Sequence, residues 1–223
     1  MKLYSYWRSS CSWRVRIVLN LKGLEYETIP VNLLKAEQRG DEYSALNPSQ
    51  CVPLLITEEG RPLAQSLAII EYLEARYSPQ RLLPADPYLA ALVRQAALII
   101  VADTQPLQNL RLLQRLFPAD PVARSAYGRS VIEAGLAAFN RVVESYVGSV
   151  AQEKETDEWY CFGPEVSLAD VVLVPQLYNA RRFGTAVEQQ FPRLAHIEGR
   201  LSKLAPFIKA SPESQPDYDA GSV

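Results

Sequence analysis

The chain has 223 residues, of which 48% are hydrophobic and 22% charged, and its formal net charge is −2. This composition is typical of a folded protein with one large or two small domains, and its scattered Lys and Arg residues form no basic stripe for nucleic acid. Neither a signal-like start nor an apolar run of about 20 residues occurs, so we expect a cytoplasmic protein that does not enter membranes.

The cysteine and histidine content narrows the chemistry further. Cys11, Cys51 and Cys161 include no Cys-x-x-Cys pair, which predicts reduced thiols rather than a redox couple. The single histidine, His196, lies in a helix-like stretch, where a surface or packing role is expected. We therefore expect no metal site, and a reactive group that arrives with a ligand.

The first part of the chain alternates strand-like and helix-like segments. We expect strands at 2–7, 26–31, 53–57 and 61–64, and helices at 12–22 and 66–77. The strand–helix–strand order predicts parallel pairing through a right-handed crossover, and the turn signal "EEGR" predicts a hairpin of the last two strands. The pattern indicates an α/β domain over residues 1–80.

A proline-rich stretch, "SPQRLLPADP" at 78–87, separates this domain from a helical remainder, which we place at 87–210. Pro106 interrupts a long helical pattern and predicts a kink near Ala102. A helix follows at about 122–147, then a polar loop, "GSVAQEKETDEW". Ser167 and Asp170 form a capping-box variant before a run that is apolar on every side, which predicts a central helix. Residues 211–223 are expected to be a loose tail.

A polar cluster, "SSCS" at 9–12, lies where the first helix begins. The free N–H groups and the dipole of a helix N-terminus stabilise anions, thiolates included, and serine hydroxyls can donate hydrogen bonds to sulfur. Serines also cap helices in countless proteins, so the cluster alone leaves both interpretations open.

Two further features are compatible with a ligand in the same domain. Pro53 begins a predicted strand; an ordinary trans bond suits that position, while a cis bond would expose the backbone of Val52 to an extended peptide-like ligand. Gln65 and Ser66 begin the next helix, where Ser66 is either a plain cap or part of a carboxylate site. A thiol site, a backbone-pairing edge and a carboxylate site together suit a thiol tripeptide.

The motifs "SSCSWRVRI", "LNPSQCVPLL", "QSLAIIEYLE", "QPLQNL" and "SLADVVLVPQL" resemble those of the zeta-class glutathione transferases over residues of about 2–217. The resemblance implies an α/β plus all-α architecture: a thioredoxin-like N-terminal domain with an all-helical C-terminal domain, the glutathione transferase fold. It also implies a homodimer that binds glutathione.

The same resemblance assigns roles to individual residues. Ser9, Ser10 and Cys11 would lie by the glutathione sulfur, with Ser9 the best candidate for stabilising the thiolate. The other implied glutathione contacts are Ser12, Trp13, Arg14, Gln38, Val52, Pro53, Gln65, Ser66, Gln105, Asn109, Leu110 and Arg111. Gln105 and Asn109, four residues apart, are expected on one helix face, as a solvated stripe or as part of the site. Arg182, with Arg8 as a second candidate, would hold a substrate carboxylate.

The implied activity is glutathione-dependent isomerisation of maleylacetoacetate to fumarylacetoacetate, in tyrosine and phenylalanine catabolism, by reversible thiolate addition. Three alternatives use the same fold: a maleylpyruvate isomerase, a general glutathione transferase or α-halo acid dehalogenase, and a non-catalytic glutathione-binding module. A glutaredoxin-like oxidoreductase built on Cys11 is disfavoured, because no second cysteine lies nearby.

Overall fold

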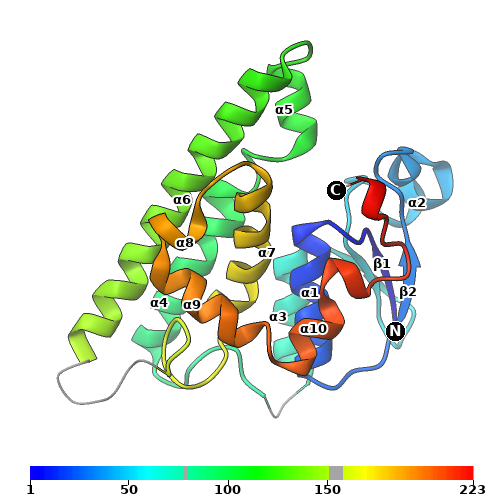
Figure 1. Cartoon of the computed structure of the whole chain (residues 1–223). Coiled ribbons are helices and arrows are strands. Elements are labelled where there is room, and N and C mark those ends of the chain that lie inside the picture. Colours follow the sequence, from blue (N-terminus) through cyan, green and yellow to red (C-terminus); the bar gives the residue numbers. More distant parts are fainter. Residues whose placement is uncertain (78–79, 151–157, 223) are drawn as a thin grey trace. The chain divides into compact units, whose positions relative to one another are not determined.

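The computed structural model describes residues 1–77, 80–150 and 158–222 and divides into two units. The α/β unit contains Met1–Arg81 together with Ser202–Val223, and the helical unit contains Leu82–Leu201. The division between them falls inside the proline-rich stretch. At its C-terminal end it differs from the expected 87–210 domain, because the last helix packs on the first helix of the α/β unit (Figure 1).

A four-stranded sheet forms the centre of the α/β unit, in the order β2-β1-β3-β4. Its strands are β1 Lys2–Ser5, β2 Glu27–Pro30, β3 Leu54–Ile56 and β4 Pro62–Ala64. The parallel pairing of β1 with β2 and the antiparallel β3–β4 hairpin confirm the predicted connections. The two edge strands, β2 and β4, each contain a proline.

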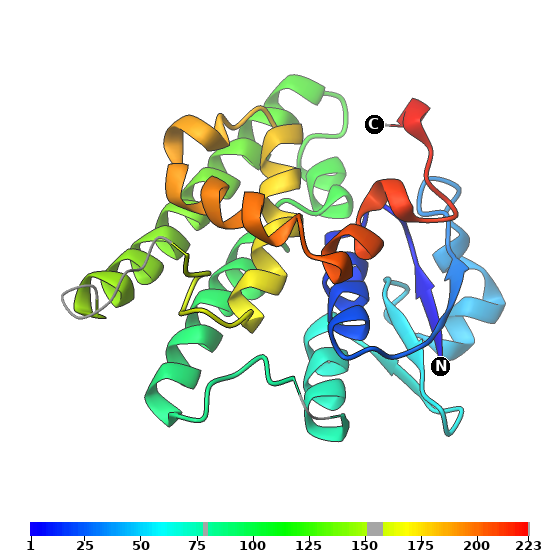
Figure 2. The same ribbon diagram turned by 60° about the horizontal axis from the view of Figure 1, so that its bottom comes forward.

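Helices cover both faces of this sheet (Figure 2). The unit contains α1 Ser10–Leu21, α2 Asp41–Leu46, α3 Ser66–Arg76, α10 Ala205–Ala210 and the 3-10 turns η1 Glu37–Arg39, η3 Pro212–Ser214 and η4 Ala220–Ser222. Alternate strand residues point to opposite faces, so Tyr4 of β1 meets Tyr43 of α2 while Leu3 faces the other way and is fully buried. Helices α1 and α3, which contact each other, cover that other face (Figure 2).

The helical unit is built around α7, Leu168–Arg182. The other helices are α4 Pro87–Leu98, the π-helical segment η2 Ile99–Thr104, α5 Leu110–Leu116, α6 Pro121–Val150, α8 Val187–Gln190 and α9 Pro192–Leu201. Every residue from Leu168 to Leu177 is buried, which confirms the predicted central helix. The predicted capping box also forms, because Asp170 accepts from the N–H and hydroxyl of Ser167 at 2.8 and 2.6 Å.

The chain around Pro106 does more than kink. The helix widens into the π-helical segment η2 and then ends, so residues 106–109 form a turn before α5 begins. Gly135 of α6 packs against this segment, and a Cβ there would overlap the side chain of Thr104. The stretch Pro87–Thr104 has the length and apolar composition of a membrane-spanning helix, a test that core helices also pass, and α4 contacts α6 and α7.

The C-terminal segment is not the expected loose tail where the structure describes it. Asp217 accepts a hydrogen bond from the Trp7 N–H at 3.0 Å, and the Tyr218 ring meets the Trp7 ring edge-on at 5.1 Å. Both partners are more than 200 residues away in sequence, so no local pattern signals the packing. Residues 148–150 of the expected polar loop belong to α6 instead, and its residues 151–157 lie outside the described part.

Candidate active site

The serine cluster lies at the N-terminus of α1, as predicted. Ser9 is the N-cap: its Oγ accepts from the Ser12 N–H at 3.2 Å, and its own N–H donates to the Tyr6 carbonyl at 3.0 Å. Ser10 and Cys11 form the start of the first turn, which contains no acidic residue. The hydroxyl proton of Ser9 is not used by the cap bond, so this end of the helix favours an anion and offers it a donor.

A buried cation lies beneath the same turn. Arg14 is only 1% exposed, and its Nε donates to the Ser10 carbonyl at 3.3 Å while its Nη2 lies 3.8 Å from the Cys11 sulfur. Its Nη1 is buried without a partner, and no carboxylate pairs with it among the described residues. An uncompensated positive charge is costly to bury, and it further favours an anion at this turn. Ser12 and Trp13 are buried beside it.

The Val52–Pro53 peptide bond before β3 is cis, which is one of the two alternatives that the sequence left open. Tyr43 Oη and Asn47 Nδ2 both donate to the Cys51 carbonyl at 2.6 Å and fix the turn. Burial raises the pKa of Tyr43 to about 12, which keeps its hydroxyl protonated as that donor. Within the described residues, neither main-chain group of Val52 has a partner, so both can pair with an extended ligand.

A second helix start lies in the same unit. Ser66 is the first residue of α3 and is buried, and Gln65 before it has φ of 71° and ψ of 114°. A non-glycine residue in this region costs about 1–3 kcal/mol and is held there by its surroundings. The first turn of α3 contains no acidic residue, and within the described residues the N-cap residue Gln65 makes no side-chain cap bond, so the N–H groups of this turn favour a carboxylate. Gln38, in η1, has a buried Oε1 that no described residue hydrogen-bonds.

Apart from Arg8, the remaining predicted residues belong to the helical unit, and one prediction about them was wrong. Gln105 and Asn109 do not share a face of one helix, because the chain leaves the helix after Gln105 and Asn109 caps α5, accepting from the Arg111 N–H at 3.0 Å. Asn109, Leu110 and Arg111 are exposed at the start of α5, and Gln105 is half-buried.

Arg182 lies at the end of a series of hydrogen-bonded side chains that the sequence did not predict. Its Nη1 donates to Asn179 Oδ1 at 3.0 Å, Asn179 Nδ2 donates to Gln108 Oε1 at 2.9 Å, and Gln108 Nε2 donates to Gln176 Oε1 at 2.7 Å. The spacing of 176, 179 and 182 could have revealed it, because residues three apart share a helix face. Arg181, in contrast, is tied to Glu188 and Glu198 at 2.8 and 2.6 Å.

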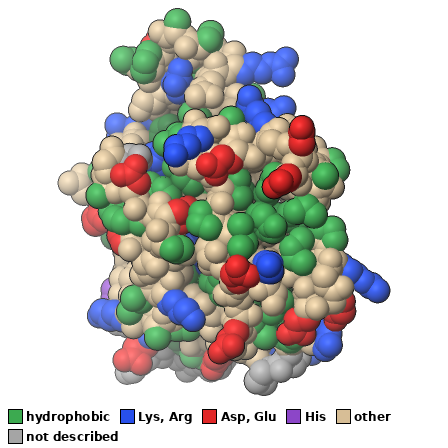
Figure 3. All heavy atoms as spheres, turned by 90° about the vertical axis from the view of Figure 1, so that its right-hand side faces the viewer, with side chains coloured by type: hydrophobic (Ala, Val, Ile, Leu, Met, Phe, Trp, Pro, Cys, Tyr) green, Lys and Arg blue, Asp and Glu red, His purple; other side chains and the backbone are tan. Residues whose placement is uncertain are grey.

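Arg8, His196 and the three cysteines are the other side chains that the sequence analysis named. The Arg8 guanidinium lies over the Trp7 ring at 5.2 Å, close to the serine cluster in sequence. His196 is exposed on α9, in agreement with a surface role. The three cysteines are free thiols, as predicted. On the face of the molecule in Figure 3, acidic and basic side chains are interspersed and form no basic stripe.

Comparison with known proteins places these features in a family. The glutathione S-transferase N-terminal domain matches residues 8–76. Maleylacetoacetate isomerase of Mus musculus is 42% identical over 98% of this chain and 95% of its own length, and that of Pseudomonas aeruginosa is 44% identical over 99% and 100%.

Solved structures give the same result. A maleylacetoacetate isomerase from Anaeromyxobacter dehalogenans, with glutathione bound in its active site, has a TM-score of 0.85 and 42% identity, and covers 98% of this chain and 97% of its own. A bacterial zeta-class maleylpyruvate isomerase has a TM-score of 0.87 and 39% identity, and covers 98% and 100%. These similarities confirm the glutathione transferase fold expected from the sequence. The chain therefore belongs to the zeta class of glutathione transferases, the family that contains the maleylacetoacetate isomerases.

Proposed function

We propose that this protein is a glutathione-dependent enzyme that isomerises maleylacetoacetate to fumarylacetoacetate. The observation that carries the proposal is the N-terminus of α1, where the Ser9 hydroxyl has a proton to donate and buried Arg14 has no carboxylate partner among the residues that the structure describes. Such a site stabilises a thiolate, and this chemistry needs one. The curated and solved relatives at about 40% identity support the same activity.

The α/β unit fits glutathione as a ligand. A thiol tripeptide needs a sulfur site, a main-chain partner and a carboxylate site. Val52 offers its unpaired N–H and C=O to the cysteinyl backbone, and Gln65 with Ser66 offers the start of α3 to the γ-glutamyl carboxylate. Gln38 contributes a buried acceptor, Oε1, that has no partner in the described part of the chain. These groups all belong to one folded unit.

Glutathione, when bound, supplies a thiolate that adds reversibly to the cis double bond, so that rotation about the resulting single bond precedes its departure from the trans product. Ser9 donates a hydrogen bond to the sulfur, and Arg14 and the first-turn N–H groups of α1 add positive potential there. Ser10 and Cys11 flank the same position. The Ser9 hydroxyl, the Arg14 cation and the N–H groups of α1 each lower the pKa of a glutathione thiol that they contact.

Recognition of the keto acid requires cationic groups, because the substrate is a dicarboxylate. Arg182 is the first candidate, since Asn179 holds one of its Nη atoms and so limits where its guanidinium points. Arg8 is the second candidate. Gln105, Asn109, Leu110 and Arg111 are proposed as additional ligand contacts. Steady-state kinetics of Arg182→Gln, with Arg181→Gln as the matched control, tests this assignment through KM for the acid.

The main experiment measures fumarylacetoacetate formation by the purified protein with and without glutathione. We expect turnover only with glutathione, and unchanged total glutathione at the end because the thiolate is released. Accumulation of a glutathione conjugate would instead indicate a general transferase or a dehalogenase. Glutathione binding without turnover of any maleyl acid would indicate a binding module.

A second candidate activity is isomerisation of maleylpyruvate, a shorter acid. The observation that favours it is the TM-score of 0.87 to a zeta-class maleylpyruvate isomerase. The ratio of kcat/KM for maleylacetoacetate and maleylpyruvate decides between the two, and we expect it to favour maleylacetoacetate.

The protein is further proposed to act as a cytoplasmic homodimer in tyrosine and phenylalanine catabolism. A groove of about 690 Å³ between α4 and α6 has apolar and aromatic lining from Tyr88, Leu92, Val142 and Tyr146 beside polar residues such as Gln95 and Arg141, and Tyr88 is 73% exposed. An exposed aromatic side chain in a groove with a polar rim suits contact with a second copy. Light scattering on the eluted peak of a sizing column checks the dimer, and Tyr88→Glu should shift it to the monomer.

A further inference from the structure

The loop between β1 and α1, residues 6–9, is held by two charged side chains that come from outside it. The Trp7 N–H donates to Asp217 Oδ2 at 3.0 Å, and Arg16 Nη2 donates to the Trp7 carbonyl at 2.9 Å. Both main-chain groups of Trp7 are therefore bound by an ionised partner. Such charge-assisted bonds are about twice as strong as bonds between neutral groups.

Arg16 links this loop to the C-terminal segment. It is fully buried, and besides Trp7 it contacts Ser5 Oγ at 3.0 Å, the Tyr6 carbonyl at 3.5 Å and the Ala210 carbonyl at 2.9 Å. Burial lowers its pKa to about 10, and the Asp217 carboxylate opposes that shift, so Arg16 stays cationic at neutral pH. Asp217 is thus an electrostatic partner of Arg16 as well as an acceptor for Trp7.

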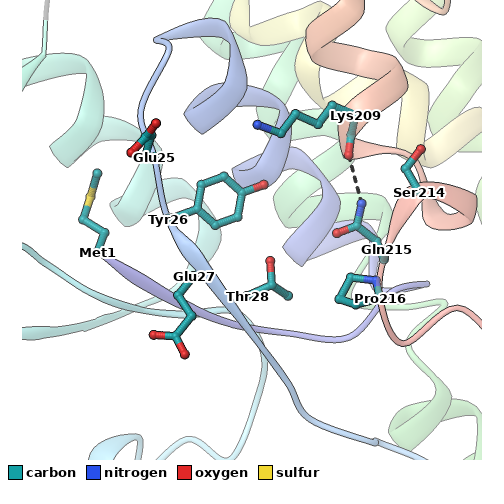
Figure 4. A pocket seen from close by; sticks show the side chains of 9 residues that line it. All are labelled: Met1, Glu25, Tyr26, Glu27, Thr28, Lys209, Ser214, Gln215 and Pro216. Atoms are coloured by element: carbon teal, nitrogen blue, oxygen red, sulfur yellow. Dashed lines mark hydrogen bonds between the residues drawn. The ribbon is translucent and has the colours of Figure 1, made fainter.

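The C-terminal segment is attached to the rest of its unit near its two ends. At one end Pro206 and Ala210 accept from Asn20 Nδ2 at 3.0 Å and from Arg16; at the other end Asp217 and Tyr218 meet Trp7. In the middle, Gln215 Nε2 donates to Lys209 and Ser211 carbonyls within the segment itself. Figure 4 shows this middle part across a cavity of about 590 Å³ from Tyr26 and Thr28. The Trp7 end of the segment therefore depends on its own contacts.

The contacts of the loop continue directly to the serine cap. The Tyr6 carbonyl that Arg16 touches also accepts the Ser9 N–H at 3.0 Å, and Ser9 Oγ in turn caps α1. Only Arg8 lies between Ser9 and Trp7, whose amide Asp217 binds. A shift of the Trp7 peptide therefore moves the Ser9 hydroxyl relative to the helix N-terminus.

We propose that Asp217 is a positioning residue for the thiol site: with Arg16 it fixes the Trp7 peptide and so sets the direction in which Ser9 presents its hydroxyl. This rests on the proposed function, in which Ser9 stabilises the glutathione thiolate. The C-terminal segment, which is remote in sequence from the serine motif, then becomes part of the catalytic framework.

Charge and position predict opposite effects of Asp217 on the bound thiol. The charged side chains that surround the loop are Arg8, Arg14, Arg16 and Asp217. Removing a nearby negative charge stabilises a thiolate and lowers the thiol pKa, whereas misdirecting the Ser9 hydroxyl raises it. The sign of the change therefore separates the two roles.

The experiment titrates the thiolate absorbance of glutathione bound to the wild type, Asp217→Ala and Asp217→Asn. Asp217→Ala removes both charge and acceptor, and we expect the thiol pKa to rise by about 0.5–1 unit with a 3–10-fold lower kcat/KM at neutral pH. Asp217→Asn keeps an oxygen acceptor, so its thiol pKa and kcat/KM should be close to those of the wild type. Asp219→Asn, an exposed neighbour that accepts from the Gly221 N–H, is the matched control and should behave as wild type.

Urea unfolding of each variant accompanies the titration. If Asp217→Ala loses stability while the thiol pKa falls or stays constant, the positioning role is overturned and the segment is a structural clamp. If glutathione bound to the wild-type protein ionises no more readily than free glutathione, the proposed function itself fails. That outcome is visible before any variant is made.

Discussion

Replacing Ser9 with alanine removes two interactions with different consequences. The first is the cap bond from the Ser12 N–H at 3.2 Å, whose loss costs about 1 kcal/mol of stability. The second is the hydrogen bond that we propose the hydroxyl donates to the glutathione thiolate, a charged acceptor, worth about 1.5–3 kcal/mol. That second loss corresponds to a rise of about 1–2 units in the thiol pKa and to a fall of about 10–100-fold in kcat/KM at neutral pH.

The assay combines urea unfolding with a pH profile of glutathione thiolate absorbance and of kcat/KM. Asp120→Ala is the matched control, because Asp120 Oδ1 caps α6 by accepting from the Ala123 N–H at 2.8 Å in the other unit. Both variants should lose about 1 kcal/mol of unfolding free energy. Only Ser9→Ala should move the thiol pKa; a Ser9→Ala protein with wild-type pKa and rate would reduce Ser9 to a cap and refute the reasoning.

Two further predictions test the packing. With a thiol reagent at pH 7, exposed Cys51 should react in the native protein and Cys161 only after unfolding, because burial excludes the reagent and raises the Cys161 pKa; equal rates would contradict that burial. Gly135→Ala should destabilise the protein by about 1–3 kcal/mol in urea unfolding, because its Cβ would overlap Thr104, whereas Gly148→Ala, with open space, should be neutral or stabilising by up to about 1 kcal/mol.

The sequence predicted the features that local patterns determine. The period of two in β1, the "EEGR" turn and the capping box of α7 all depend on residues close together in the chain, and each was found. The ends of helices moved by one to three residues, as at α6, which begins at Pro121 and ends at Val150. Local propensity sets where a helix exists better than where it stops.

The features that escaped prediction depend on distant contacts. Nothing near Asp217 in sequence indicates a bond to Trp7, and nothing near Arg16 indicates the Ala210 carbonyl. The break after η2 escaped for a different reason: Pro106 signals an interruption, but whether the helix resumes after it depends on packing. Gln105 and Asn109 were misplaced because their spacing has meaning only in a continuous helix.

The two outer strands of the sheet affect whether the protein aggregates in concentrated solution. In β2, Glu27 and Val31 donate to β1, so the nitrogen of Pro30 faces outward; in β4, the Thr57 N–H donates to the Arg61 carbonyl, so the nitrogen of Pro62 also faces outward. A proline nitrogen has no hydrogen to donate, and each border of the sheet therefore offers an incomplete template to a foreign strand. Concentrated solutions should accordingly resist fibre growth by strand addition at these borders.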